Sequence, residues 1–520
     1  MSFVIYNAPL SAWKGNEMKW NSRGFWKLAM MCVVASFGCG QSNEGANLPI
    51  PTAPVSTQTQ FIGSTFGFDY ETYELTGPYP ASTENYPLYN PDPSNTSLTW
   101  DTWIRQAGQA GLDFIAPNLR GAYPDATWSP ALMAPVLTAL NNTGFASQIK
   151  IAAFDDNAAS WQAQWQMANN LPGTEPFDIS NPANWTYIYD NNYKIFLETI
   201  PDANRFKIDD RPVYIVWTGN PATVGNEQGN YSKAMTYLRQ KSQADFGVNP
   251  YIIVNIDALQ NDTTLGAVVD AAQGWSGGGT WTLETFNNTK IGVAFPGLDA
   301  STSSTFRDPN HGITLNTALT NTVGAGALIT LMEGFTDYEE DAALMQVRNL
   351  DTNGNPLSYS STLYDYPNQR LDIVRQHSLN PFPSNLLHEA EGADYYGGAA
   401  GGNGKTNYYR NGNIAIEPTS DTGGGFDVGW MQPGEWFEWE SVPLNGQPHF
   451  LVRIATSSSG QTAHFVIDGI AQPSQTLPNT GGLQNWTTYD FGAYGTYTNS
   501  YHIVRIVFDR GGANFNWWQL

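Results

Sequence analysis

The sequence is poor in cysteine, histidine and basic residues, and each shortage excludes a class of protein. Only Cys32 and Cys39 occur, so no disulfide framework and no cysteine-based metal site can extend beyond the first segment. The six histidines are scattered without a helix-spaced pair, which argues against a zinc enzyme. With 24 basic and 47 acidic residues the net charge is −23, which excludes nucleic acid or an anionic membrane surface as a partner.

Motifs for nucleotide and ester chemistry do not occur in a suitable setting either. No GxGxxG and no GxxxxGK[ST] follows a predicted strand, so nucleotide binding has no support. No GxSxG on a strand-to-helix turn supports an esterase. The negative charge disfavours a polysaccharide lyase acting on uronates.

What the sequence does contain is length and an excess of aromatic residues. Its 520 residues, 41% of them hydrophobic, are enough for sizeable cores in two or three domains. Aromatic residues make up 13%, with 18 Trp and 26 Tyr. Because the C–H face of a sugar stacks on an aromatic plane, sugar binding is one purpose that such rings serve.

The first 38 residues have the pattern of an export signal. Basic residues precede the apolar stretch Leu28–Phe37, which is too short to cross a bilayer as a helix. The segment ends at Cys39 in a way that resembles a bacterial lipoprotein signal, and residues 39–60 are a polar, flexible tether. We expect a secreted protein or an outer-surface bacterial lipoprotein, with membrane contact only through a lipid on Cys39. Simple secretion and lipidation stay equally open.

Between residues 61 and 383, apolar runs typical of strands alternate with stretches at helical spacing. Strands are predicted over residues 61–69, 112–118, 149–156, 211–217, 250–257, 274–278, 290–297 and 327–333. Helices are predicted over residues 97–110, 129–140 and 231–244. This alternation predicts an α/β fold, a (β/α)8 TIM barrel, and a doubly wound open sheet is the alternative.

Polar and aromatic side chains recur just after nearly every predicted strand. They are Asp69, Asn118, Asp155, Trp217, Asn255, Trp275 and Glu333. Any one of them alone favours a helix cap or surface group, but the carboxyl ends of barrel strands meet at one mouth, so the set predicts a substrate site there. Asp209 and Asp210 precede their strand, and we interpret them as a turn at the opposite end.

The stretch from Gly324 to Asp341 joins an apolar run to a group of carboxylates. The run stops at Glu333, and further carboxylates follow within eight residues at Asp337, Glu339, Glu340 and Asp341. Paired carboxyl groups beside aromatic rings at a strand end are what glycoside hydrolysis requires. Glu333 is therefore the first candidate for a catalytic carboxyl, and Asp337, Glu339 or Asp155 is its partner.

The segments IKIAAFDDN, DRPVYIVW and ALITLMEGFTDYEED, in this order, resemble the barrel of glycoside hydrolase family 99 and its family 71 relatives. The resemblance covers about residues 61–380. In family 99, two glutamates three residues apart on the last strand act around the 2-hydroxyl and the leaving oxygen. The resemblance implies that Glu333 is the first of them, whereas Thr336 stands at the second position and cannot act as an acid. It implies a divergent relative, with the mannose preference of the family left open.

Residues 384–520 resemble a family 6 carbohydrate-binding module. The matching segments include HEAEGADYY, GFDVGWMQPGEWFEWESVPL, FVIDG and HIVRIVFDRGGANFNWWQL. Short alternating strands between Gly, Pro and Asn turns independently predict a β-sandwich. In that family two loop aromatics and an Asn hold the sugar, which implies Trp430, Trp486 and Asn514 here. Each tryptophan taken alone would be assigned to the core.

Modules of this family also carry a structural calcium ion. The resemblance implies Glu389 and Glu391, which are one strand period apart, and Asn516, which stands where an Asp is common, as its ligands. The alternative for the two glutamates is an ordinary exposed strand face. No cofactor is expected for catalysis.

These features predict a monomeric glycoside hydrolase that cleaves a neutral polysaccharide or oligosaccharide with a carboxyl pair at the barrel mouth. The module would hold the polysaccharide close to that mouth. Thr336 in place of a glutamate motivates the alternative, a non-catalytic surface protein that captures glycans.

Overall fold

The computed structural model describes residues 60–66, 86–88, 96–119, 129–217, 222–275, 279–299, 306–337, 342–348, 364–398, 414–423 and 425–520. The predicted export signal, the tether, Cys39, Asp69, Glu339 and Glu340 lie outside these ranges. Within the described ranges, no helix is long and apolar enough to cross a membrane.

The N-terminal domain is built on parallel strands. Its strands are β1 (Phe61–Phe66), β2 (Tyr86–Pro87), β3 (Phe114–Pro117), β4 (Lys150–Ile151), β5 (Ala153–Asp156), β6 (Phe177–Asp178), β7 (Lys207–Ile208), β8 (Arg211–Trp217), β9 (Val224–Gly225), β10 (Tyr251–Asn255), β11 (Ala271–Gln273), β12 (Trp281–Phe286), β13 (Thr289–Ala294), β14 (Leu298–Asp299), β15 (Phe306–Arg307), β16 (Ile329–Met332) and β17 (Val347–Arg348). One sheet has the order β12-β13-β16-β1-β3-β4, and the other has the order β11-β10-β8-β5. Within these two orders the pairing is parallel everywhere except between β12 and β13.

The two sheets meet at the edge that carries β4 and β5, and within the part of the chain that the structure describes they are not paired at the opposite edge, between β11 and β12. The stretch Lys150–Asp156 carries β4 in the first sheet and β5 in the second, and a parallel bridge joins Asn118 to Phe154. On the far side β11 packs beside β12 and β13, but no ladder joins them among the described residues. A closed TIM barrel is therefore not confirmed. The sixth predicted strand, 274–278, is displaced: β11 ends at Gln273.

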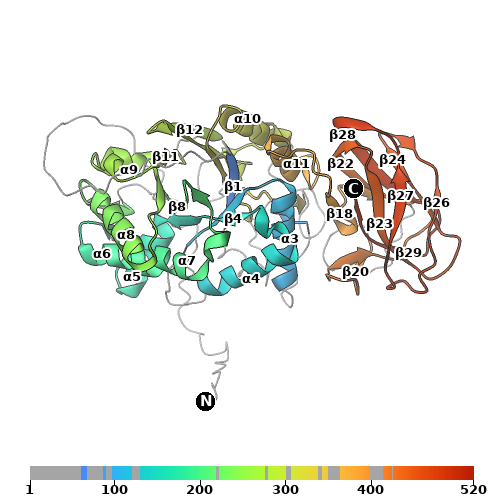
Figure 1. Cartoon of the computed structure of the whole chain (residues 1–520), viewed down its shortest axis with the longest axis horizontal. Helices are drawn as coiled ribbons and strands as arrows, with labels where there is room; N and C mark the ends of the chain where they lie inside the picture. Colours follow the sequence, from blue (N-terminus) through green and yellow to red (C-terminus); the bar gives the residue numbers. More distant parts are fainter. Residues whose placement is uncertain are drawn as a thin grey trace, which may run out of the picture.

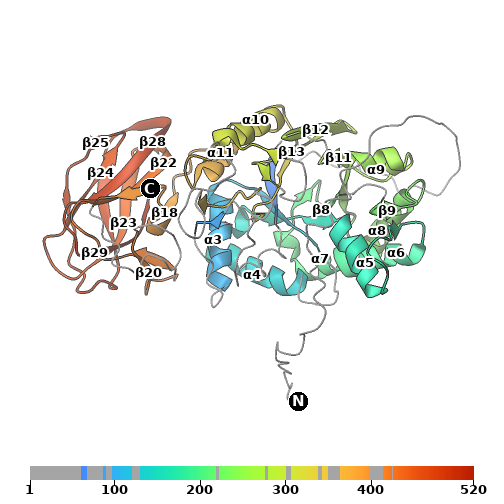
Figure 2. The same cartoon turned by 180° about the vertical axis from the view of Figure 1, so that it is seen from behind.

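Helices surround these strands (Figures 1 and 2). They are α3 (Thr96–Gln109), α4 (Ser129–Asn142), α5 (Gln164–Ala168), α6 (Pro182–Ile188), α7 (Lys194–Thr199), α8 (Tyr231–Phe246), α9 (Ile256–Asn261), α10 (Ile313–Thr322) and α11 (Gln369–His377), with short 3-10 turns η1 (Phe145–Ser147), η4 (Asp202–Asn204), η5 (Leu265–Ala267) and η6 (Asn310–Gly312) and π turns η2 (Asn157–Ala163) and η3 (Tyr189–Tyr193). The three helices predicted from spacing are confirmed as α3, α4 and α8. Gly247 caps the carboxyl end of α8, and its φ of 70° suits a residue without a Cβ.

Alternate residues of the strands enter two different cores. Outward residues such as Ile115, Tyr214 and Ile252 pack against the helices. The residues one position away, such as Phe114 and Ile215, form a second cluster that draws on strands of both sheets. The two sheets therefore face each other across a shared apolar interior, and side-chain parity decides which residues reach it.

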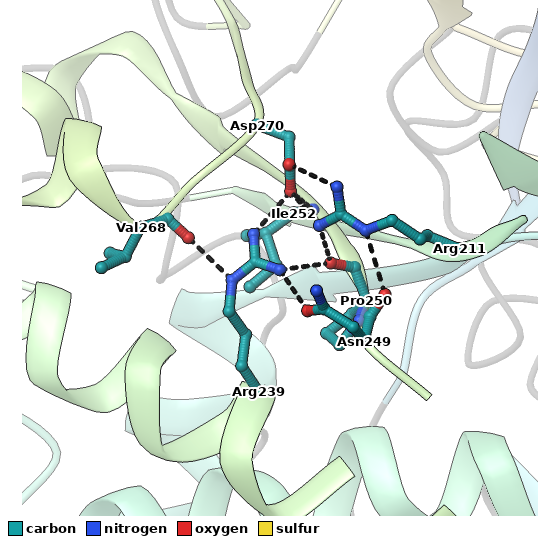
Figure 3. A network of polar contacts seen from close by, with 7 residues as sticks. All are labelled: Arg211, Arg239, Asn249, Pro250, Ile252, Val268 and Asp270. Atoms are coloured by element: carbon teal, nitrogen blue, oxygen red, sulfur yellow. Dashed lines mark hydrogen bonds and ion pairs between the residues drawn. The ribbon is translucent and has the colours of Figure 1, made fainter. Parts of the chain in front are cut away.

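A buried ionic network fixes the amino ends of β8, β10 and β11 (Figure 3). Asp270 accepts from Arg211 at 2.7 and 2.8 Å, from Arg239 at 2.6 Å and from the Ile252 amide at 2.8 Å. The arginines also donate to the Pro250 carbonyl. Because this end lies away from the carboxyl ends of the strands, we interpret the network as structural.

The turn that leads into β8 lies close to this network. Asp209 and Asp210 join β7 to β8 with φ values of 51° and 60°. They form the turn that was predicted, and they take no part in the site at the opposite strand ends.

The C-terminal module is a sandwich of two six-stranded sheets, and the predicted all-β fold is confirmed. Its elements are β18 (Leu387–Glu389), η7 (Ala390–Gly392), β19 (Tyr395–Gly397), β20 (Ile416–Pro418), β21 (Phe426–Val428), β22 (Glu435–Gly446), β23 (His449–Thr456), β24 (Thr462–Ile467), β25 (Ile470–Ala471), β26 (Gln475–Thr476), β27 (Thr487–Ala493), β28 (Tyr497–Phe508) and β29 (Ala513–Gln519). Its core includes Phe437, Phe465, Phe515 and Trp518.

The module lies beyond α3 and α11 at one end of the long axis in both views (Figures 1 and 2). Polar contacts join the two parts. Asn368 donates to Asp394 at 2.7 Å, and Arg375 donates to the Ser441 carbonyl at 3.1 Å.

Candidate functional site

Glu333 stands at the carboxyl end of β16, on the face that points into the shared interior. The strand alternates so that Ile329 and Leu331 enter that interior, and Glu333 continues their parity. Its amide donates to the Ala294 carbonyl at 3.1 Å, which extends the pairing with β13 by one residue. Only 4% of the residue is exposed. The predicted catalytic carboxyl is therefore an interior group rather than a surface charge.

The surroundings of Glu333 favour its protonated form. Burial raises the pKa of Glu333 to about 7, while the Arg307 charge and a hydrogen bond from Trp275 act in the opposite direction. The Arg307 guanidinium lies 3.8 Å from the centre of the Phe295 ring. Phe295 is beside Glu333, because the residues before them, Ala294 and Met332, are paired in register. A carboxyl with such a pKa can give or take a proton near neutral pH.

A row of polar side chains crosses the four neighbouring strands of the second sheet. Asp156 is paired in register with Trp217, and Asn255 is paired with Gln273. Val216 pairs with Val254, so Trp217 and Asn255 are neighbours as well. Each of the four lies two positions after an interior residue of its own strand, so all four side chains are on the inward face. The structure thus brings together the predicted Trp217 and Asn255 with two residues that were not predicted, Asp156 and Gln273.

Trp275 connects this row to Glu333. Its amide donates to Gln273 Oε1 at 2.6 Å, and its indole donates to the Glu333 carboxyl. Its ring lies 5.5 Å from Phe154 and 5.9 Å from Phe295, centre to centre, so it touches both sheets. The predicted Trp275 is therefore a wall shared by the two halves of the site.

Three buried polar atoms at these strand ends have no hydrogen-bond partner among the described residues. They are Oε2 of Glu333, Nε2 of Gln273 and Oδ1 of Asn118. Leaving such atoms unpaired costs stability, so they are a common sign of a missing ligand or water. An amide donor, an amide acceptor and a carboxyl group around aromatic rings are the groups that bind sugar hydroxyls.

Asp155 does not take the position that was predicted for a catalytic partner. Its parity turns it toward the helices, where Asn192 donates to it at 3.0 and 3.2 Å and Ser160 and Tyr214 also bind it. Burial raises its pKa to about 6 against these hydrogen bonds. We correct its assignment to a structural anchor, because the residue that faces the interior is its neighbour Asp156.

Asp337 follows Glu333 in a tight turn. Gly334 has φ 63°, and its amide donates to Thr65 Oγ1 at 2.8 Å. The Asp337 amide donates to the Gly334 carbonyl at 3.2 Å. Asp337 is nearly buried, and Thr336 is fully buried. The turn therefore keeps Asp337 close to Glu333. The predicted Asp69 and Glu339 lie outside the described residues.

The predicted sugar-binding tryptophans lie on two loops at one end of the module. Trp430 and Trp486 are both half-buried, and the Trp486 indole donates to Gln484 Oε1 at 3.3 Å. They precede β22 and β27. Neither is a core residue, which fits the binding role rather than the alternative.

Asn514 lies below this surface instead of on it. It is 1% exposed, and its Nδ2 donates to Glu417 at 2.9 Å and to Asp427 at 3.1 Å. Burial raises the pKa of Asp427 to about 7. The structure therefore places Asn514 as a residue that holds two carboxyl groups under the loops.

The residues predicted to bind calcium lie at the junction of the two parts. Glu389 forms an ion pair with Arg105 of α3, and Asn516 Nδ2 donates to Asp421 at 2.8 Å. Burial, and then the Glu389 charge, raise the pKa of Glu391. No cluster of three or more His, Cys, Asp or Glu among the described residues could hold a metal ion. In this arrangement the three residues do not fit a calcium ion, and calcium binding stays a prediction.

A cavity of about 250 Å³ opens beside these residues, between α3, α11 and the first strand of the module. Its lining includes Arg105, Asp372, Arg375, Glu391 and Asp394. It does not reach Glu333, so it is separate from the strand-end site.

Nothing in the sequence indicated Gln273 and Arg307, and the sequence favoured Asp155 over its neighbour Asp156. The doubled aspartate at residues 155 and 156 could have been resolved by parity from Phe154, whose inward position makes Asp156 the inward residue. Gln273 ends a strand whose position was placed three residues too late. Arg307 comes from a two-residue strand, which no periodicity reveals.

Two family models match the chain. Residues 58–395 match the family described as a domain of unknown function (DUF5010), and residues 410–520 match a carbohydrate-binding module of family 35. The predicted carbohydrate-binding module is therefore confirmed; the family model that matches it is that of family 35. These matches do not show the predicted resemblance to glycoside hydrolase families 99 and 71.

Similar proteins include one curated relative and several solved carbohydrate-binding modules, each covering a small part of this chain. The clotting factor G alpha subunit of Tachypleus tridentatus is 28% identical over 117 residues, which cover 21% of this chain and 17% of that protein. A module from Cellvibrio mixtus lichenase 5A, solved with cellotriose, and a β-1,3-glucan-binding family 6 module from Bacillus halodurans are each 26% identical. Each covers 26% of this chain and 94% of the solved chain, with a TM-score of 0.21.

Proposed function

The chain belongs to the DUF5010 family, and from this premise we propose that its N-terminal domain hydrolyses glycosidic bonds of a neutral polysaccharide that the module holds. The observation that carries the proposal is the Glu333 carboxyl, 4% exposed, with a pKa raised to about 7 by burial. A protonated carboxyl between aromatic rings at strand ends is the acid that glycoside cleavage needs.

The proposal includes a barrel-like arrangement of the two sheets. Trp275 touches rings from both sheets, and the interior cluster draws on both. The carboxyl ends of β5, β8, β10 and β16 would then surround one site. In that arrangement the row of Asp156 and Trp217 lies across the interior from Glu333.

The proposal gives each of these residues one role. Glu333 gives its proton to the leaving oxygen as the bond from the anomeric carbon to that oxygen breaks. A water molecule then adds its hydroxide to the anomeric carbon and gives its proton to Asp156 or Asp337. Trp217 and Trp275 stack on the sugar ring, and Gln273 and Asn118 bind its hydroxyls through their unpaired atoms.

The experiment is a polysaccharide panel. The full chain is incubated with neutral β-glucans, mannans, xylans and galactans, and new reducing ends are measured. Release from at least one polysaccharide, with binding to the same one, is the expected result. Binding without release from any member would contradict hydrolysis.

A second function, glycan capture without catalysis, is favoured by Thr336. It stands where family 99 has a second glutamate, and it is fully buried. If the panel shows binding alone, this function replaces the first.

The pH dependence of hydrolysis should reveal the protonation state of Glu333. Because burial raises the pKa of Glu333 to about 7, the group is protonated below that pH and ionised above it. If it acts as the acid, kcat is level below about pH 7 and falls about tenfold per pH unit above. Initial rates from pH 5 to 9 check this. A rate that rises through pH 7 would make Glu333 a base.

Polysaccharide binding should depend on the two loop tryptophans. Trp486→Ala and Trp430→Ala each remove a stacking surface, so we expect each to weaken binding about tenfold, or about 1.4 kcal/mol. Affinity electrophoresis of the full chain measures this. Trp436→Ala is the matched control, because Trp436 packs under the Arg505 guanidinium, 3.9 Å away, on a sheet face. An equal loss in the control would contradict a specific role for the loops.

A further inference from the structure

Three side chains of the module form a chain of hydrogen bonds at the end where β22 finishes. Ser500 Oγ lies 2.7 Å from His502 Nε2, and His502 Nδ1 lies 2.6 Å from Asp468 Oδ2. The imidazole therefore contacts a hydroxyl with one nitrogen and a carboxylate with the other. This is the arrangement of a serine nucleophile, its general base and the acid that orients the base.

Local structure explains how the three meet. Ser500 and His502 are two residues apart on β28, so they point to the same face. Asp468 comes from the tight turn between β24 and β25, with φ 49°, followed by Gly469 with φ 78°. Its second oxygen accepts the Ile503 amide at 2.9 Å. The carboxylate is thus fixed on both oxygens, as a residue that orients a histidine must be.

The arrangement is also accessible to a ligand. The His502 side chain is 15% exposed, and that of Asp468 is 50% exposed. Ser500 is half-buried. The Tyr497 ring stands edge-on to the imidazole at 5.0 Å, which limits its rotation. A small acyl group can therefore approach Ser500 from solvent.

We propose that Ser500, His502 and Asp468 form a second hydrolytic site, one that cleaves small carboxylic esters. Ser500 Oγ attacks the acyl carbon and gives its proton to His502 Nε2. The ester C–O bond breaks, and the alcohol leaves with that proton. Water then attacks the acyl-serine, its proton passes to His502, and the acid is released with Ser500 restored.

The oxyanion of this reaction needs backbone N–H donors near Ser500. Leu444 pairs with Ser500 and Gly446 pairs with Tyr497, so the register shifts between these pairs. Asn445 on β22 and Thr498 and Asn499 on β28 fall inside the shift, without a register partner. The proposal assigns the oxyanion donors to the backbone amides of this irregular stretch.

The site is separate from the sugar-binding loops. Those loops lie near the far end of β28, where Gly512 bonds to Met431. Ser500 and Phe508 are eight residues apart on β28, or about 26 Å along an extended strand. Ester cleavage and polysaccharide binding can therefore be tested independently.

A neighbouring group in the same module provides a matched control. His464 Nδ1 lies 2.8 Å from Asp509 Oδ1, and Ser474 Oγ donates to Asp509 Oδ2 at 2.6 Å. The residue types are the same, but this serine bonds to the carboxylate and not to the imidazole. It therefore has no imidazole to take its proton, and we expect it to be inert.

The experiment measures p-nitrophenyl acetate hydrolysis and fluorophosphonate labelling by the full chain. We expect Ser500→Ala and His502→Gln each to lower kcat/KM about 10³-fold or more, and the double variant to lose no more than either alone. Ser474→Ala and His464→Gln should stay within about twofold of the wild type. Polysaccharide binding, unchanged in all four, shows that the module is folded.

Labelling of the wild-type chain tests the site even if a variant fails to fold. A fluorophosphonate adduct mapped to Ser500 of the wild-type chain, and lost in His502→Gln, supports the site. An unlabelled Ser500, or Ser500→Ala with wild-type hydrolysis, overturns it.

Discussion

Glu333→Gln is expected to lower kcat for polysaccharide hydrolysis by about 10²–10⁴-fold while leaving binding unchanged. The amide has the shape of the carboxyl and can still accept the Trp275 hydrogen bond, but it cannot give a proton to the leaving oxygen. The proposal assigns polysaccharide binding to loops of the module, and Glu333 lies in the other domain. Reducing-end release and affinity electrophoresis on the same protein separate the two effects.

The matched control is Glu198→Gln on α7, which makes the same chemical change on an exposed helix position. Its activity should be that of the wild type. If Glu333→Gln retained full turnover, Glu333 would have no part in the chemistry.

Stability gives a second readout for Glu333. The pKa of Glu333 is about 7 in the folded state, against 4.5 for an ordinary glutamate, so between these pH values the folded state binds one more proton than the unfolded chain. Wild-type stability therefore falls as the pH rises through this window. Glutamine has no charge to bury, so the variant should be the more stable protein at pH 8 and lose this slope.

The sequence predicted the strand positions well because buried parallel strands are continuous apolar runs. Seven of the predicted runs contain an observed strand, from β1 to β16. The exception is the weak apolar run at 274–278, because the observed strand, β11, is the short AAQ before it. Ala is a weak strand former, so composition gave no indication of it.

Site residues could be predicted from the sequence only where their position at the end of a strand is enough to place their side chains in the interior. Glu333, Trp217 and Asn255 each end a strand, and parity carries them inward. Asp155 was chosen over Asp156 because the strand's register was unknown, and a shift of one residue reverses the face.

The module's ester site shows the limit of motif searches. Its Ser500 and His502 are separated by one residue, and β25, β26 and β27 lie between Asp468 and the strand that carries them, so no serine hydrolase motif contains all three. Conversely, residues 274–278 read G-W-S-G-G, the letters of GxSxG, but the next described element is the strand β12 and not a helix. Such a site is identified by the arrangement of its side chains and not by a sequence motif.

Asp270→Ala is expected to destabilise the N-terminal domain by about 3–5 kcal/mol. The substitution leaves Arg211 and Arg239 buried with no carboxylate between them (Figure 3). It also frees the Ile252 amide, which donates to Asp270 at 2.8 Å, at the start of β10. Burying uncompensated charge is among the largest costs that one substitution can impose.

The control for this prediction is Asp202→Ala. Asp202 also contacts two cations, Arg205 and Lys207, but its side chain is 64% exposed. Water can replace its ion pairs, so we expect a loss of less than about 1 kcal/mol. Urea unfolding followed by tryptophan fluorescence compares the two variants. Equal losses would mean that Asp270 acts as a surface ion pair, and that the amino ends of β8, β10 and β11 are held by apolar packing instead.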